Sequence, residues 1–289
     1  MKVSEIVTEK ILKMLEAGVA PWARPWQANG IHMRYSGKPY RGINQLLLSL
    51  TTHETPIWIT YRAAAALGGN VKRGEKGMPC VYWNFPTAEE SAAGKRAYPR
   101  YSTIFNIGQC ENVPTPKWYT RATVNIFSPI ETAAAIVRGM PNCPKINHGG
   151  DSAYYRPSND SVNMPSAESF YKPESYYATL FHELAHSTAS DKRIGRPITA
   201  DSMRAESYGK EELIAELCSA ILCNESRIDS GSVTAASASY LACWIKTLRG
   251  DSSLIMAASS AAQRAADFIL DHKPELESES EAESESVAA

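Results

Sequence analysis

The spacing of hydrophobic residues predicts alternating helices and strands in the first half of the chain. Residues 3–17 place apolar side chains three and four positions apart, which is typical of an amphipathic helix, and Gly18 ends the pattern. Residues 18–42 are rich in proline and glycine and are predicted to be loop. The pattern then predicts a helix, a strand that runs into a second helix, and two β-rich runs, at 43–54, 57–69, 78–85 and 101–110.

The second half is predicted to be mostly helical. A connecting helix is expected around 128–139, and the stretch 151–165 predicts two short strands joined by a turn. Apolar periodicity predicts four further helices, at about 173–189, 208–225, 234–249 and 253–271. The fold class expected is α+β, a mixed α/β domain followed by a mostly helical domain with a small antiparallel sheet.

The composition is that of a soluble globular protein with two domains. The chain has 289 residues, of which 44% are hydrophobic, and no apolar run approaches the roughly 18 residues of a membrane span. Six cysteines form no CxxC pair, which indicates reduced thiols in a cytoplasmic protein. We expect domains at 1–125 and 147–273, with a linker at 126–146. The Glu- and Ser-rich tail 274–289 is predicted to be disordered.

The net charge of −1 hides a difference between the two halves. Residues 1–125 hold 16 Lys and Arg against 8 Asp and Glu, whereas residues 126–289 hold 14 against 23. The first half would therefore attract a polyanion and the second would not, which indicates two separate tasks.

The motif HELAH at 182–186 predicts a metal site. On a helix, His182 and His186 project from the same side and can take two corners of a tetrahedral zinc site. Glu183 is placed to act as the general base for the attacking water in a zinc hydrolase. A buried helix with two hydrogen-bonded histidines is the alternative, but the motif is rare by chance and favours a metal.

A carboxylate is the expected third ligand, because no third histidine follows HELAH. Glu212 and Glu216 lie four residues apart on one side of the predicted helix 208–225. We predict Glu212 as the ligand and Glu216 as the hydrogen-bond acceptor for a ligand histidine, with Glu211 as the alternative ligand. Glutamates that merely solvate the helix are the competing interpretation. Such a donor set favours Zn²⁺ and also accepts another divalent ion such as Mn²⁺.

The predicted strand just upstream of HELAH is a candidate substrate-binding edge. A zinc hydrolase can pair an extended peptide with such a strand. Tyr154 or Tyr155 could stabilise a developing oxyanion there, and Tyr155 is our candidate; ordinary strand aromatics are the alternative.

Tryptophans and basic residues share the first half of the chain. Five of the six tryptophans lie there: Trp22, Trp26, Trp58, Trp83 and Trp118. Aromatic rings beside cations are suited to sequence-tolerant binding of single-stranded nucleic acid, because every base has a π-face and every phosphate a charge. Trp58 and Trp83 lie inside β-like runs and are predicted to be core, and for Trp22 and Trp26 core and binding roles are equally open. The candidate DNA contacts are Trp22, Arg24, Trp26, Arg41, Lys72, Arg73 and Lys76.

The chain resembles the ArdC antirestriction family over about residues 1–270. PWARPW, YRGINQLLL, WITYRAAAALGGNVKRGEKGMPCVYW and FNIGQCENV are similar to the N-terminal domain of that family, which also occurs in plasmid-encoded TraC-type primases. DSAYYRPSNDSVNMP, YYATLFHELAHSTA and KEELIAELCSAIL are similar to the metallopeptidase domain attached to it.

The resemblance implies a plasmid-borne protein that binds single-stranded DNA and protects incoming conjugative DNA from host restriction. It also implies a zincin fold, gluzincin-like or SprT-like, in which His182, His186 and Glu212 bind the metal and Glu183 is catalytic. Protection could come from shielding DNA or from cleaving a host restriction-related protein. The alternative function is a non-catalytic DNA-binding module whose metal is structural. A primase or nuclease is disfavoured, because no cluster of Asp and Glu suits a two-metal site.

Overall fold

The computed structural model describes residues 2–17, 31–51, 53–86, 88–92, 94–119, 129–196, 205–228 and 238–272. The side chains of residues 88, 92, 129, 205–208, 238–241 and 243 are not described. The predicted DNA contacts Trp22, Arg24 and Trp26 and the predicted disordered tail lie outside the described residues.

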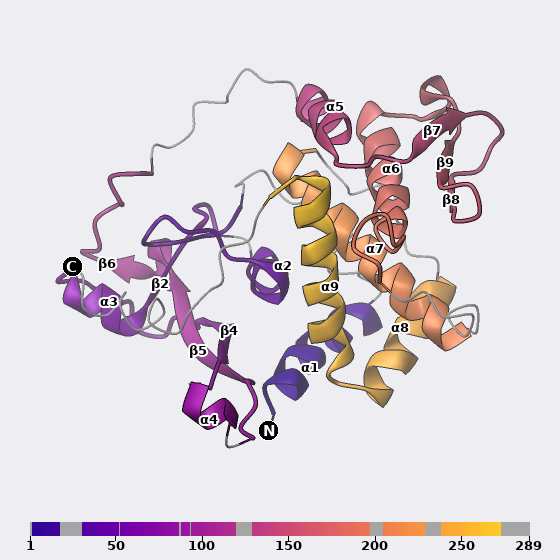
Figure 1. Cartoon of the computed structure of the whole chain (residues 1–289). Helices are drawn as coiled ribbons and strands as arrows, with labels where there is room; N and C mark the ends of the chain where they lie inside the picture. The colour runs from indigo at the N-terminus through magenta and orange to yellow at the C-terminus, as the bar shows by residue number, and fades with distance from the viewer. Residues whose placement is uncertain are drawn as a thin grey trace. The chain divides into compact units, whose positions relative to one another are not determined.

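The described chain forms two compact units (Figure 1). The first comprises residues 31–119, and the second comprises residues 4–17 together with 129–272. The opening helix α1 (Val3–Glu16) therefore belongs to the second unit, although the sequence places it in a domain spanning 1–125. The predicted linker 126–146 likewise contains helix α5 (Pro129–Gly139), whose Ala133 is fully buried, so the second unit begins earlier than expected.

A four-stranded mixed sheet organises the first unit. Its strands run in the order β1-β2-β5-β4, with β1 parallel to β2 and the other pairs antiparallel. A separate two-stranded ladder joins β3 to β6. The strands are β1 (Met33–Arg34), β2 (Ile57–Thr60), β3 (Asn70–Val71), β4 (Met78–Asn84), β5 (Tyr98–Asn106) and β6 (Cys110–Glu111). The helices are α2 (Gly42–Ser49), α3 (Tyr61–Ala66) and α4 (Ala88–Ala92), followed by the 3₁₀ turn η2 (Ile107–Gln109).

Both faces of this sheet are packed, because successive residues of a strand point to opposite sides. Trp58 of β2 belongs to one cluster with Leu48 of α2 and Ile104 of β5. Its neighbour Ile59 belongs to a second cluster with Ala63 and Ala64 of α3. Helix α3 starts where Thr60 accepts a hydrogen bond from the Ala63 N–H, and it is followed by Gly68 in the left-handed region.

The two strand tryptophans differ in burial. Trp58 is fully buried, as predicted, and its indole N–H donates to His32 Nδ1 over 3.1 Å. The prediction that Trp83 is core is wrong, because its side chain is 46% exposed. Trp83 lies near the end of β4, past the segment that packs on α2 through Met78 and Cys80.

The second unit is built mainly from helices. Helix α7 packs against both α6 and α9, and α5 lies beside α6 and α7 (Figure 1). Small residues such as Ala258, Ala262 and Ala265 on the buried side of α9 allow close helix packing. Besides α1 and α5, the helices are α6 (Pro173–Ser187), α7 (Ala205–Ser226), α8 (Ala238–Gly250) and α9 (Leu254–Ile269). A 3₁₀ turn, η3 (Ala167–Ser169), precedes α6.

The small sheet of the second unit has one strand more than predicted. Strands β8 (Tyr154–Arg156) and β9 (Ser161–Met164) form the expected antiparallel pair. Strand β7 (Lys145–His148) adds to the other side of β9 in parallel, so the sheet is mixed and β8 and β7 are its edges. The predicted fold class, α+β with a mixed first domain and a helical second one, is confirmed.

Two further observations concern the class of protein. Within the described ranges, no helix has the length and apolar character needed to cross a membrane. Five described cysteines are free thiols: Cys80, Cys110, Cys143, Cys218 and Cys223.

Candidate metal centre

Helix α6 presents both histidines of the motif on one side. The helix begins with Pro173 at its N-terminus, where a missing N–H costs nothing. Leu180, Phe181 and Leu184 are buried. His182 and His186, one turn apart, are partly exposed on another side. The apolar residues therefore fix the rotation of the helix, and that rotation aims the imidazoles at α7.

Helix α7 supplies the carboxylates. Its buried residues Leu213 and Leu217 anchor it in the core, and Ser219 Oγ donates to the Ala178 carbonyl of α6 over 2.9 Å. Glu212 and Glu216 lie one turn apart and are both buried. Two buried glutamates with histidine partners are not the solvated helix residues that formed the competing interpretation.

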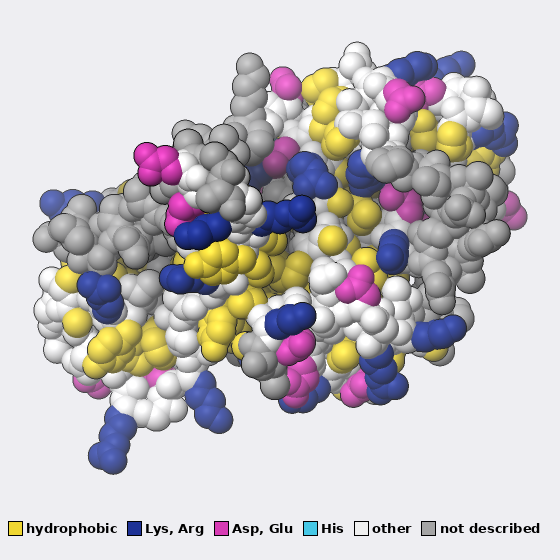
Figure 2. Space-filling view, turned by 60° about the horizontal axis from the view of Figure 1, so that its bottom comes forward, with side chains coloured by type: hydrophobic (Ala, Val, Ile, Leu, Met, Phe, Trp, Pro, Cys, Tyr) yellow, Lys and Arg dark blue, Asp and Glu magenta, His cyan; other side chains and the backbone are white. Residues whose placement is uncertain are grey.

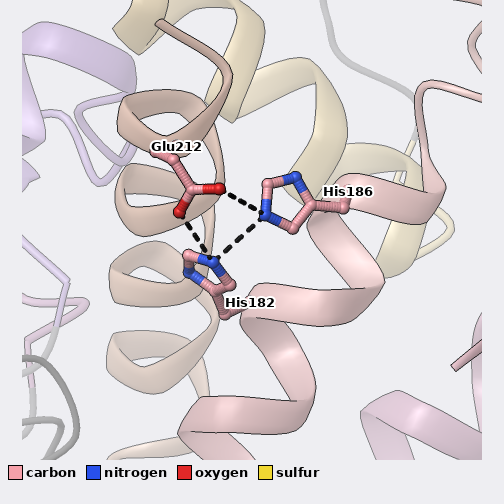
Figure 3. Close-up of side chains that lie close together, drawn as sticks. All are labelled: His182, His186 and Glu212. Carbon is pink, nitrogen blue, oxygen red and sulfur yellow. Dashed lines mark hydrogen bonds and ion pairs between the residues drawn. The ribbon is translucent and has the colours of Figure 1, made fainter. Parts of the chain in front are cut away.

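Three ligand atoms converge between the helices (Figure 3). His182 Nε2 lies 3.1 Å from His186 Nε2; His182 Nε2 lies 3.4 Å from Glu212 Oε2, and His186 Nε2 lies 3.4 Å from the other oxygen, Oε1. A tetrahedral ion about 2.0–2.1 Å from each ligand sets the ligand atoms roughly 3.3–3.4 Å apart. The spacing of these donors therefore fits a divalent metal ion.

The outer nitrogens of both histidines also face carboxylates. His186 Nδ1 lies 3.4 Å from Glu211 Oε1, and His182 Nδ1 lies 3.8 Å from Glu216 Oε1, beyond hydrogen-bonding distance. Glu211, the alternative ligand in the sequence, thus stands behind His186 rather than beside Glu212. Carboxylates in this position orient a ligand histidine and fix its tautomer.

A residue that the sequence does not single out holds Glu211 in place. The Arg196 guanidinium donates to Glu211 Oε1 over 2.7 Å and to the Ala185 carbonyl over 3.0 Å. Its side chain is only 9% exposed, and its buried Nε and Nη1 atoms have no hydrogen-bond partner among the described residues. Arg196 follows α6 in a connecting segment without periodicity, so nothing in the sequence connects it with Glu211.

The carboxylates shape the proton affinity of the site. Burial opposes a charge on His186, but hydrogen bonds to Glu211 and Glu212 prevail and raise the pKa of His186 to about 10. Burial acts to raise the pKa of Glu212, but hydrogen bonds from His182 and His186 hold it well below its ordinary value. A cation is therefore stabilised at this point, and a metal ion would replace the proton.

Glu183 lies close to this set without belonging to it. Its side chain is buried, and its negative charge helps to raise the pKa of His186. A buried carboxylate close to three groups that could bind a metal is suited to accepting and returning a proton.

Tyr155 is bonded elsewhere. Its hydroxyl donates to Asp160 Oδ1 over 2.9 Å, and Asp160 also pairs with Arg193 at 2.8 Å. Tyr154, on the neighbouring position, accepts a hydrogen bond from Arg156. Either tyrosine would have to leave its partner to reach a substrate.

The described DNA candidates lie in different parts of the first unit. Lys72 donates to the Gly108 carbonyl over 3.0 Å, whereas Arg73 and Lys76 are exposed in the same turn. Arg41 precedes α2 as its N-cap residue.

Family models match both halves of the chain. Residues 1–108 match the N-terminal domain of the anti-restriction factor ArdC, and residues 133–261 match a zincin-like metallopeptidase. The crystal structure of the antirestriction ArdC protein from plasmid R388, in its Mn(II)-bound form, is 33% identical and superposes with a TM-score of 0.75. The match covers 94% of this chain and 98% of that one. This chain belongs to the ArdC family.

Other members extend this comparison. The metal-free structure of the R388 ArdC protein gives a TM-score of 0.76 at 31% identity, covering 95% of this chain and all of that one. The uncharacterized protein y4eC of Sinorhizobium fredii is 32% identical over 92% of this chain and 90% of its own. A DNA primase TraC of Escherichia coli is 36% identical over 92% of this chain. The chain spans only 27% of the length of that primase and 20% of a second TraC primase. The family resemblance found in the sequence is thus confirmed.

Proposed function

We propose that this ArdC-family protein protects incoming conjugative DNA from host restriction, binding single-stranded DNA with its first unit and hydrolysing peptide bonds with its second. The observation that carries the enzymatic part is the convergence of His182, His186 and Glu212 beside the buried Glu183. The protein would act in the cytoplasm of a donor or recipient bacterium, and its partners would not include a membrane.

The second unit supports a metal-dependent peptidase. A divalent ion held by His182, His186 and Glu212 would supply Lewis-acid activation of a peptide carbonyl and of water. Glu183 accepts the proton of the attacking water and passes it to the leaving nitrogen. Glu211 orients the His186 imidazole, and Glu216 faces the outer nitrogen of His182 at 3.8 Å. Zn²⁺ is the ion we propose, and Mn²⁺ is the alternative, because an ArdC crystal structure contains Mn(II).

The edge strand β8 supports binding of an extended peptide. It pairs with β9 on one side only, so its other edge can add a substrate strand. Tyr155 could stabilise the oxyanion if its hydroxyl left Asp160 on substrate binding. A host restriction-related protein is the substrate class that fits antirestriction.

The first unit supports binding of a polyanion. Its described residues 31–119 hold 11 Lys and Arg against 5 Asp and Glu. Exposed Arg73 and Lys76 lie within one turn, and Lys72 and Arg41 add positive charge to the same unit. We propose these four cations, with Trp22, Arg24 and Trp26, as DNA contacts.

The alternative is a DNA-binding module whose metal only stabilises the second unit. A structural site needs ligands but no nearby base. Burial of Glu183 beside the ligand set costs free energy, and it is easier to understand if the carboxylate acts in catalysis.

Transfer of unmodified DNA into a restricting host tests the proposal. Wild type, Glu183→Ala and the exposed-glutamate control Glu131→Ala are compared, after metal content and folding are shown to be equal. Loss of protection in Glu183→Ala alone means that hydrolysis protects the DNA. Protection that persists means that the DNA-binding unit is sufficient, and absence of protection by wild type overturns the proposal.

A further inference from the structure

The first unit carries a group of exposed aromatic side chains on one hairpin. Trp83 and Tyr101 of the β4–β5 pair are 46% and 48% exposed, and Tyr98 and Phe85 are exposed to a similar degree. On the first unit, at the left of Figure 2, hydrophobic side chains lie at the surface beside Lys and Arg side chains. Rings of this size are usually removed from water in a monomer, so a cluster of them indicates a binding surface.

The strand register divides these rings between the two faces of the hairpin. Val81 lies opposite Tyr101, and Trp83 lies opposite Pro99, so these four side chains share one face. Trp83 and Tyr101 are diagonal neighbours on that face, close enough for one bound molecule to contact both rings. Among the described residues, neither ring is stacked on another ring or covered by a cation.

The opposite face of the hairpin already has partners. Arg100 pairs across the strands with Tyr82. Its guanidinium lies over the Tyr98 ring, 5.4 Å from the centroid, and donates to the Tyr98 hydroxyl over 3.0 Å. Tyr98 is therefore held in place by Arg100, whereas no described ring or cation covers Trp83 or Tyr101.

The open edge of β4 is not available to a protein strand at this position. The Asn44 side chain of α2 accepts from the Val81 N–H over 2.7 Å and donates to the Val81 carbonyl over 2.6 Å. This amide replaces the pairing that an added strand would make. The accessible feature is thus the aromatic face of the hairpin rather than its edge.

The charge of the surroundings selects a polyanionic ligand. The described part of the first unit has an excess of six positive side chains, 11 against 5. Arg96 and Arg100 are exposed on the same hairpin. An aromatic pair on a unit with an excess of positive side chains suits single-stranded nucleic acid, whose bases can leave the stack and whose phosphates need cations. Duplex DNA buries its base faces and offers nothing to the rings.

We propose that Trp83 and Tyr101 form a base-stacking platform for single-stranded DNA, with exposed cations of the first unit such as Arg96 as phosphate contacts. This inference rests on the proposed DNA binding of the first unit and deepens it. It places base contacts on the sheet surface, in addition to the predicted loop contacts Trp22 and Trp26.

Binding of a fluorescent oligothymidylate to the full-length protein tests the platform. Trp83→Ala and Tyr101→Ala are each expected to lower affinity roughly 5-fold to 100-fold, in keeping with the stacking of one base per ring. The dependence of affinity on salt should stay unchanged, because no phosphate contact is lost. Tyr171→Ala, which removes a fully exposed ring of the second unit, is the matched control.

A second readout does not depend on variants. Photo-cross-linking of a bromodeoxyuridine oligonucleotide to wild type should label peptides from residues 78–106. Affinities of both variants within twofold of wild type, or cross-links confined to other segments, overturn the platform while leaving DNA binding intact. Wild type that binds no single-stranded DNA overturns the proposed function as well. If the two variants lose affinity for duplex DNA as much as for single-stranded DNA, base stacking is also contradicted.

Discussion

Single side chains in the candidate metal centre have separate tasks. His182, His186 and Glu212 converge as candidate ligands, Glu211 and Glu216 face the outer nitrogens of the imidazoles, and Glu183 is buried nearby. The four-residue spacing of the motif predicts the first pair, because an α-helix returns to the same side every turn. The distinction between Glu211 and Glu212 needs the structure, because adjacent residues on a helix point about 100° apart and only α6 decides which one faces the metal.

Replacing Glu183 with Gln should separate catalysis from metal binding. We expect Glu183→Gln to keep metal affinity within about threefold and to lower peptide hydrolysis by a factor of roughly 10² to 10⁴, because the proton acceptor is lost. Glu212→Gln should instead weaken metal binding. Calorimetric titration with Zn²⁺ and cleavage of an unfolded protein substrate measure the two effects. Undiminished hydrolysis by Glu183→Gln would contradict its role as the base.

Arg196 should influence the metal through Glu211. Arg196→Met removes the 2.7 Å contact to Glu211 and also two buried nitrogens that have no partner among the described residues, so we expect a folded protein whose metal affinity falls about 10-fold. The readout is metal affinity together with the rise in melting temperature on adding metal. Arg138→Met, on the exposed side of α5, serves as control. Equal metal affinity in both variants would show that Arg196 does not position the site.

At the level of elements, periodicity predicts helices better than it predicts short strands. Helix α6 was expected at 173–189 and is observed at Pro173–Ser187, because its apolar stripe is long and regular. The sequence does not predict strand β7, because its four residues KINH show no clear alternation of apolar and polar side chains. They form a strand through pairing with β9. The burial of Trp83 is also not predictable from the sequence, because a β-rich run does not show which end of the strand extends beyond the core.

One ion-pair cluster ties the β8–β9 turn to the segment that follows α6. Asp160 adopts a left-handed φ of 50° in that turn and binds the Arg193 guanidinium, whose side chain is 1% exposed. Arg193 also donates to the Ser187 carbonyl at the end of α6. The β8–β9 hairpin and the end of α6 are thereby held in one arrangement.

This cluster predicts a loss of stability in acid. The Arg193 hydrogen bonds, acting against burial, lower the pKa of Asp160 from 3.8 to about 2. Because the folded pKa is depressed, the stabilisation is complete above about pH 4 and is lost as pH falls toward 2. Asp160→Asn tolerates the same φ, and it should lower the free energy of unfolding at pH 7 by about 2 kcal/mol.

Urea unfolding at pH 7 and pH 3 measures this effect. The difference in the free energy of unfolding between wild type and Asp160→Asn should be smaller at pH 3, because the wild-type carboxyl group takes up a proton as the pH falls toward its pKa. An equal difference in the free energy of unfolding at pH 7 and pH 3 would show that charge pairing with Arg193 does not cause it.

At the level of the whole molecule, the order of residues does not coincide with the compact units. Helix α1 comes first in the chain but packs in the second unit, where Thr8 Oγ1 donates to the Ser252 carbonyl and Glu16 pairs with Arg249. A domain boundary placed near residue 125 from composition cannot reveal that α1 packs in the second unit. The apolar side of an amphipathic helix shows that the helix packs against another element, but not against which one.

Shortening a buried residue of α1 should therefore affect the unit that holds the metal site. Ile11 is fully buried, and Ile11→Ala should cost about 2–5 kcal/mol. The thermal transition that is raised by metal should move to lower temperature, as followed by calorimetry with and without Zn²⁺. The exposed neighbour Lys10→Ala is the control. A shift confined to the transition that does not respond to metal would contradict this assignment.

The charge difference between the two halves predicts how DNA binding responds to salt. Neutralising several phosphates with the cations of the first unit releases counterions, so single-strand affinity should fall roughly 10-fold or more between 50 and 200 mM salt. Fluorescence anisotropy across this range measures the slope. An affinity that stays flat would exclude the basic unit as the binding site.

Local spacing and motifs along the chain predict the longer helices, the α+β class, the family and the histidine pair, but not the short helix α4. Only the packing of the elements shows that Glu212 faces the histidine pair, that Arg196 binds Glu211, that α1 packs in the second unit and that Trp83 is exposed. Each of these depends on which elements meet across long separations in the chain. Local periodicity shows that one side of an element is buried, but only the packing of the folded chain determines which other element covers it.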